Sequence, residues 1–326
     1  ILRCYGYDNI PINPPKSGPV ARATDYSASE KLKGGLVFGG FQELMHMPFV
    51  STETFNALNS NNWSPAELSN PINENEPLMR VSLFGSLFSA INLNVKKGYS
   101  AMKFFEHGNV FRKIKNGFVQ ESHISGLIYF HESQKTWSDK SLQYDFYSLK
   151  AEVLQLLETL RVKSIKLVPN SSSMIFTVNA MDIFAGKRKI GMLGEINPTA
   201  TQKLIKNPAF GFEIYPEKIS TKSSTLKLKP VSKFPSSSRD LNILINQSYS
   251  YAEIETVLLN SKIQFLHSLG LANTFEGKGI PDGSISMTLR FMFQSPVKSL
   301  KESEINTSMD KAFHLLNKAF KAKIRS

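Results

Sequence analysis

The chain has 326 residues, of which 41% are hydrophobic and 20% charged, and its formal net charge is +12. This composition is typical of a globular protein, and the length suits two domains better than one. No apolar run reaches the roughly 18 residues that a membrane helix needs, so no membrane-spanning helix is expected. The surplus of positive charge favours a polyanionic partner, most often nucleic acid; a lysine-rich soluble surface is the alternative.

The cysteine and histidine content indicates whether the chain can form disulfides or zinc sites. The single cysteine, Cys4, has no internal partner for a disulfide, which favours a reducing cytoplasm. The six histidines are scattered and lack zinc-ligand spacing, so no metal site is expected. The first 24 residues are rich in proline and glycine and show neither an initiator Met nor a signal pattern. We expect them to be the exit from a preceding small helical domain, in a chain cut from something longer.

Apolar spacing predicts an α+β domain with a mainly antiparallel sheet between residues 25 and 216. Its first helix should carry Leu32, Leu36 and Val37 on one face and end at Gly39 and Gly40. The predicted helices are 26–40, 82–98 and 145–160, and the predicted strands are 41–51, 102–114, 123–133, 164–168, 174–186, 189–196 and 209–216.

The polar, Ser/Thr/Lys-rich segment 217–232 is the best candidate for a linker. After it, residues 233–326 alternate as a compact βαββαβ unit, which is the ferredoxin-like arrangement. Its expected strands are 239–245, 264–277, 284–295 and 323–326, and its expected helices are 249–261 and 301–322. Ser250, with Glu253 three residues later, predicts a capping box at the start of the first of these helices.

Several stretches carry a family resemblance across nearly the whole chain, in the family's order. They are "ILRCYGYDNIP", "GGFQELMHMPFVS", "NPINENEPLMRVSLFGSLFSAINLNVKKG", "KFFEHGNVFRK", "IGMLGEINP", "KFPSSSRDLNILI" and "TFEGKGIPDGSISMTLRFMFQSPVKSLKESEIN". Together they resemble the C-terminal half of the bacterial phenylalanyl-tRNA synthetase β subunit.

The resemblance implies a class II synthetase-like core at 25–216 that does not catalyse, and a ferredoxin-fold anticodon-binding domain at 233–326. It implies a cytoplasmic α₂β₂ heterotetramer in which a catalytic α subunit uses ATP and Mg²⁺ to charge tRNA(Phe) with phenylalanine. This chain would hold no cofactor or metal. The alternatives are a stand-alone RNA-binding or scaffold protein built from the same modules, and an independent ATP-using ligase, which would need both class II arginines.

Arg112 and Glu106 mark the place where a class II core carries an Arg-x-Glu strand-loop-strand motif. No acidic residue follows Arg112 at that spacing, and "IGMLGEINPTATQKL" has no second arginine. We therefore expect Arg112 to be structural or to face a subunit interface. Three carboxylates in this module could instead act as acids or bases, but ion pairs with Arg80 and Arg112 are favoured; they are Glu43, Glu106 and Glu195. His46 and His131 are expected to be hydrogen-bonded strand residues.

In the second module, the family's Asp-x-Tyr-x-Gly appears as Asn273 to Gly277, with Phe275 at the aromatic position. Phe275 keeps a face for base stacking, and Asn273 keeps a hydrogen-bonding edge. Ser284 and Arg325 also match family positions near the anticodon. Arg239 is expected either to pair with its neighbour Asp240 or to contact RNA. Lys233 and Arg290 are candidate phosphate contacts, with a solvated surface as the equal alternative.

Overall fold

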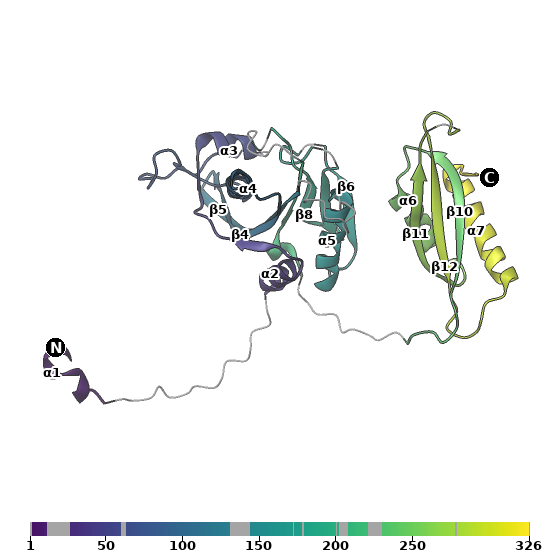
Figure 1. Ribbon diagram of the computed structural model, residues 1–326, viewed down its shortest axis with the longest axis horizontal. Coiled ribbons are helices and arrows are strands. Elements are labelled where there is room, and N and C mark those ends of the chain that lie inside the picture. The colour runs from purple at the N-terminus through teal and green to yellow at the C-terminus, as the bar shows by residue number, and fades with distance from the viewer. Residues whose placement is uncertain are drawn as a thin grey trace. The chain divides into compact units, whose positions relative to one another are not determined.

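The structure is a computed structural model, and it describes residues 2–11, 27–59, 63–130, 144–171, 173–177, 179–199, 201, 208–220, 230–277 and 279–325. The chain divides into two compact units, residues 1–224 and 225–326 (Figure 1). Among the described helices, none is long and apolar enough to cross a membrane.

The first unit is built on a seven-stranded sheet whose strand order is β1-β4-β5-β9-β8-β7-β6. Only β1 pairs in parallel, with β4; the other neighbours in this sheet are antiparallel. The strands are β1 (Gln42–Leu44), β4 (Ala101–Ile114), β5 (Gly117–Phe130), β6 (Ile165–Pro169), β7 (Met181–Ala185), β8 (Arg188–Glu195) and β9 (Ala209–Ile214). The predicted α+β class is confirmed.

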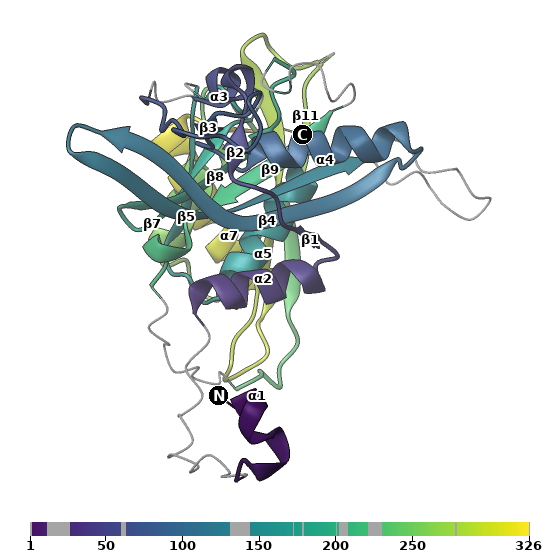
Figure 2. The ribbon, with the colours of Figure 1, turned by 90° about the vertical axis from the view of Figure 1, so that its left-hand side faces the viewer.

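Helices cover both faces of this sheet. Helix α4 (Phe84–Lys96) packs on one face, together with α3 (Thr52–Leu58), and α2 (Ala28–Phe38) and α5 (Phe146–Thr159) pack on the other (Figure 2). Strand β9 lies in the middle of the sheet between both layers, so all six of its residues are buried. The apolar residues of α5 recur at helical spacing and are buried, among them Phe146, Leu149, Val153 and Leu157.

Several details of the first unit differ from the prediction, and α3 has no counterpart among the predicted helices. Segment 41–51 is not one strand: β1 joins the large sheet, whereas β2 (Phe49–Val50) pairs with β3 (Leu78–Met79) in a small sheet of its own. In α2 it is Ala28, not Val37, that completes the buried face with Leu32 and Leu36. The helix ends at Gly39, as predicted, because Gly40 adopts a positive φ of 83°.

Another difference lies at 174–186, where only β7 is a strand of the large sheet. Ile175 and Phe176 precede it in a loop and are buried in the core beneath α4. Apolar residues in a short run predict burial but do not distinguish a strand from a packed loop. The short elements outside the sheets are α1 (Leu2–Tyr5), η1 (Tyr7–Asn9) and η2 (Pro216–Lys218).

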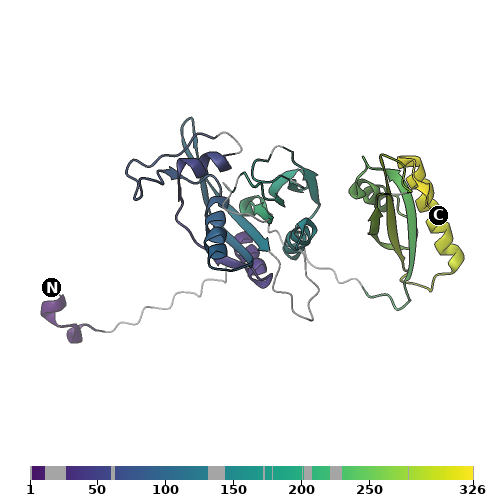
Figure 3. The same cartoon turned by 45° about the horizontal axis from the view of Figure 1, so that its top comes forward.

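The second unit has the predicted βαββαβ order and a four-stranded antiparallel sheet in the order β11-β12-β10-β13. Its two helices pack on the same face of this sheet, and α7 runs along it in Figure 3. The elements are β10 (Ser237–Asn246), α6 (Tyr251–Asn260), β11 (Leu266–Phe275), β12 (Ser284–Phe293), α7 (Glu302–Phe320) and β13 (Lys323–Ile324). Both hydrogen bonds of the capping box between Ser250 and Glu253 are present at the start of α6.

Candidate nucleic-acid interface

The second unit leaves one face of its sheet uncovered by helices. Side chains alternate along each strand, so Ile243 and Ile245 of β10 and Leu289 and Phe291 of β12 point into the helix-covered core. The residues between them point to the other side, which we call the open face. Because it carries polar and partly exposed side chains, it can present hydrogen-bonding groups to a ligand.

Register aligns these side chains in rows across the sheet. Asn242 of β10 lies opposite Thr288 of β12, and Thr288 lies opposite Asn273 of β11. On the other side of β10, the backbone N–H of Arg325 donates to the carbonyl of Asn242 at 3.0 Å. The next row brings Phe275 opposite Ser286.

These rows enclose a shallow hollow of about 420 Å³ on the open face. It is lined by Asn242, Asn273, Phe275, Ser286, Thr288 and Arg325. The hydroxyl of Thr288 donates to Oδ1 of Asn242 at 2.7 Å, which fixes the orientation of that amide. The Arg325 guanidinium carbon lies 5.2 Å from the centre of the Phe275 ring. The hollow therefore combines amide edges, an aromatic face and a cation, which together suit an unpaired nucleic-acid base and its phosphate.

A bulge in β11 decides which side chains reach this hollow. Gly270 lies opposite Arg290 and Leu271 opposite Leu289, but the register then skips Ala272, so Asn273 lies opposite Thr288. In a regular register, Ala272 would lie opposite Thr288, and Asn273 and Phe275 would face the helices, because a one-residue shift exchanges the two faces of a strand. The bulge thus places both residues on the open face.

Three of the residues singled out from the sequence meet in this hollow: Asn273, Phe275 and Arg325. Ser284 lies on the same face, but in a neighbouring hollow of about 460 Å³ that Lys321 and Lys323 also line. Half of the hollow comes from residues that sequence reasoning missed, namely Asn242, Ser286 and Thr288. Strand alternation could have found Asn242, since the buried positions of β10 have the opposite parity.

Arg239 does not pair with Asp240, because adjacent strand residues point to opposite faces. Arg239 faces the helices, where its Nη2 lies 3.8 Å from Oε1 of Glu302. Asp240 instead accepts two hydrogen bonds from Arg290, at 2.8 and 2.7 Å, and those bonds hold its pKa below the ordinary value. Lys233 is exposed in the segment that precedes β10. Arg239 and Lys233 are not among the residues that line the hollow.

In the first unit, Glu106 forms a buried ion pair with Arg80. Arg80 and Glu106 are only 4% and 1% exposed, and Nη1 of Arg80 donates to Oε1 of Glu106 at 2.6 Å. Nδ1 of His46 lies 2.8 Å from the other carboxylate oxygen, and Nε of Arg80 donates to the carbonyl of Asn109 at 3.0 Å. Burial alone would raise the pKa of Glu106, but the hydrogen bond from His46 and the charge of Arg80 outweigh it and lower that pKa.

Arg112 lies on the long β4–β5 hairpin and is bound by its own neighbours. Its Nη2 donates to Oε1 of Glu121 on the facing strand at 3.1 Å, and its guanidinium lies over the Trp63 ring at 5.0 Å.

Of the other two carboxylates, Glu43 pairs with Lys33 at 3.0 Å, and Glu195 is half-buried on β8. His131 lies outside the described residues. Within the described part of the chain, no three His, Cys, Asp or Glu side chains are grouped to hold a metal ion.

Comparison with known proteins gives a matching family model for each of the two units. The family model described as "Phenylalanyl tRNA synthetase beta chain CLM domain" matches residues 10–215, and that described as "Ferredoxin-fold anticodon binding domain" matches residues 232–325. Among solved structures, a pyrrolysyl-tRNA synthetase of Desulfitobacterium hafniense has a TM-score of 0.44 and 14% identity; the match covers 59% of this chain and 64% of that one.

Curated relatives match over nearly the full chain. The phenylalanine–tRNA ligase β subunit of Syntrophus aciditrophicus is 28% identical, over 94% of this chain and 39% of that protein. The β subunit of Idiomarina loihiensis is also 28% identical, over 100% of this chain and 42% of that protein. The chain thus spans about two fifths of the length of these relatives. With a family model matching well over half of its residues, this chain belongs to the phenylalanyl-tRNA synthetase β-chain family.

Proposed function

We propose that this chain binds the anticodon of tRNA(Phe) on the open face and supports its charging with phenylalanine without performing the reaction. The observation that carries the proposal is the hollow around Phe275, which lies within the part of the chain that matches the anticodon-binding family. Phe275 is 44% exposed, so its ring can stack with an unpaired base.

The polar groups around Phe275 suit the rest of a nucleotide. Asn242 and Asn273 offer amide edges that can both donate and accept hydrogen bonds to a base. The guanidinium of Arg325 lies over the ring, where it can extend the stack or meet a phosphate. Arg290 is less suited to bind phosphate, since Asp240 already neutralises it.

Arg112 and Glu106, the residues at the class II motif of the first unit, do not fit an ATP–Mg²⁺ site. Amino-acid activation requires cations that are free to meet the charge developing on the phosphates. Arg112 is instead bound to Glu121 and Trp63, and Glu106 is bound to Arg80 and His46. We therefore assign ATP and Mg²⁺ to a catalytic α subunit, in a cytoplasmic α₂β₂ enzyme.

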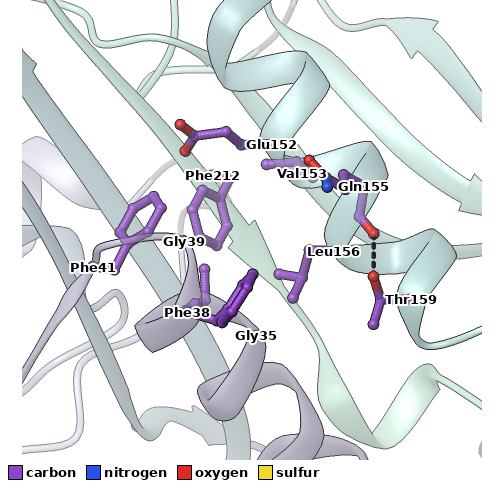
Figure 4. A pocket seen from close by; sticks show the side chains of 11 residues that line it. Gly35, Phe38, Gly39, Phe41, Glu152, Val153, Gln155, Leu156, Thr159 and Phe212 are labelled. Atoms are coloured by element: carbon purple, nitrogen blue, oxygen red, sulfur yellow. Dashed lines mark hydrogen bonds between the residues drawn. The ribbon is translucent and has the colours of Figure 1, made fainter.

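An apolar groove between α2 and α5 suits the contact with that α subunit. The groove has a volume of about 490 Å³, and Gly35, Phe38 and Phe41 line one side of it while Val153 and Leu156 line the other (Figure 4). Phe38 is 95% exposed at the end of α2, which is unusual for so large an apolar side chain. Burying this helix end against a partner would remove that apolar surface from water.

Binding of a tRNA(Phe) anticodon stem-loop tests the RNA part of the proposal. The whole chain should bind this stem-loop more tightly than one with a scrambled anticodon, and the affinity should fall as salt rises. Equal affinity for both stem-loops would favour the alternative of a general RNA-binding protein. Weak binding without salt dependence would contradict an RNA site on the open face.

The second test concerns catalysis and the α subunit. The chain alone, mixed with phenylalanine, ATP and labelled pyrophosphate, should give no exchange of label into ATP. Co-expressed with an α subunit of the family, it should co-purify at the mass of an α₂β₂ complex, and Phe38→Asp should weaken that association. Exchange by the chain alone would refute the non-catalytic role, and unchanged association of the variant would remove the groove from the interface.

A further inference from the structure

The first unit has a second concave surface, lined by positive charge and remote in the chain from the open face. It lies where the loop after α5, the β7–β8 turn and the segment after β9 meet, and it encloses about 730 Å³. Five of its lining residues are cationic, namely Arg161, Lys163, Lys187, Arg188 and Lys218, and none of its lining residues is Asp or Glu. We call this surface the basic pocket.

Backbone geometry holds the three segments of the basic pocket together. Arg161 and Ser164 adopt positive φ values of 59° and 56°, which turn the chain tightly between α5 and β6. The N–H of Gly186 in the β7–β8 turn donates to the carbonyl of Ser164 at 3.0 Å. Nη1 of Arg188 donates to the carbonyl of Lys218 at 3.3 Å, so the third segment is joined to the same turn.

Two of the cations in the basic pocket are without an acidic partner among the residues that the structure describes. Asp182, on the adjoining β7, is already paired with Lys189 at 2.8 Å. Lys163 and Lys187 are exposed and form no ion pair with any residue that the structure describes. Like charges that converge on one hollow raise the local positive potential. This potential makes the binding free energy of an anion there more favourable.

We propose that the basic pocket binds phosphate groups of an RNA backbone, as a second RNA contact apart from the open face. Lysine binds phosphate as a point charge, so lysines around one hollow suit phosphates, whose contacts position a nucleic-acid backbone without reading its sequence. The same chain presents a base-binding hollow in its second unit, and a surplus of +12 favours one extended polyanion over two separate partners. This inference rests on the proposed tRNA binding, and the test below separates the two.

The test compares two double variants of the whole chain with full-length tRNA(Phe) as the probe. Lys163→Gln/Lys187→Gln removes two charges from the basic pocket, and Lys97→Gln/Lys115→Gln removes two exposed charges elsewhere in the first unit. Binding is measured from 50 to 300 mM salt, roughly the range in which phosphate contacts dominate affinity. The pocket variant should bind more weakly at low salt, and its slope of log affinity against log salt should be shallower by about 2. The control variant should keep the slope of the unmodified chain.

Each outcome has a distinct meaning. If both variants behave alike, the basic pocket is not an RNA contact, while the proposed anticodon binding stands. If the unmodified chain does not bind tRNA at all, the proposed function itself fails. If the pocket variant keeps its tRNA affinity but loses the α subunit on co-purification, the pocket serves an acidic protein surface and the inference is overturned. Unfolding by urea, followed by tryptophan fluorescence, verifies that both variants are folded.

Discussion

Replacing Arg80 by Met probes the buried ion pair that joins β4 to the segment before α4. The substitution removes the 2.6 Å contact with Glu106 and the 3.0 Å bond to the carbonyl of Asn109. The Glu106 carboxylate is only 1% exposed in the unmodified chain, and in the variant His46 is its remaining partner. Removing one partner of a buried pair costs about 3–5 kcal/mol, because the other charge stays buried and uncompensated.

Urea unfolding followed by tryptophan fluorescence measures this cost in the first unit alone. The two tryptophans of the chain are Trp63 and Trp137, and both belong to that unit. A matched control is Lys189→Met, which breaks the partly exposed pair with Asp182 and should cost less than about 1 kcal/mol.

The double variant Arg80→Met/Glu106→Gln should recover part of the loss, because it also removes the unpaired charge. If Arg80→Met costs no more than Lys189→Met, the interpretation of a buried and mutually dependent pair is refuted.

Three further perturbations test other parts of the structure. Glu106 has a lowered pKa in the folded chain, so its ionised form adds stability above the ordinary pKa of about 4.3, and this contribution is lost as pH falls through the folded pKa. The stability gap between the unmodified chain and Glu106→Gln should therefore narrow below about pH 4.3; a constant gap would contradict this. Gly108→Ala would make the new Cβ clash with Nη2 of Arg80 and should cost about 1–3 kcal/mol, less in the Arg80→Met background. If the costs of Gly108→Ala and Arg80→Met simply add in the double variant, the new Cβ does not clash with Arg80. Ser250→Ala removes the cap of α6 and should cost about 1 kcal/mol, seen as faster amide exchange in 251–260 but not in α7.

Local patterns in the sequence predict the elements of the second unit well. The capping box at Ser250, the alternation of β10 and the helical spacing of α7 each indicate one conformation, and the structure has all three. In the first unit, the same reasoning fails for segment 41–51, which was predicted as one strand. Its apolar residues are interrupted by polar ones and by Pro48, which breaks a strand pattern just before β2, and β1 and β2 pair with different strands.

The candidate site was harder to predict because it depends on register. The bulge at Ala272 sets the face of Asn273 and Phe275; Gly270 in "LGLANTF" is a general signal of a bulge but does not fix the residue at which the register shifts. The partner of Arg112 is likewise a product of pairing, since Glu121 reaches it only across the β4–β5 hairpin. By contrast, the separation of Arg239 from Asp240 follows from strand alternation alone and could have been predicted.

The most direct test of the central claim is the affinity of Phe275→Ala for the tRNA(Phe) anticodon stem-loop, measured with the whole chain. Loss of one stacked base should weaken binding by about 1–3 kcal/mol. The control is Phe118→Ala, which removes another exposed aromatic ring, on β5 of the first unit, and should leave the affinity unchanged. A fall in affinity confined to Phe275→Ala is the result we predict. Equal affinities for the unmodified chain and Phe275→Ala would contradict base recognition on the open face.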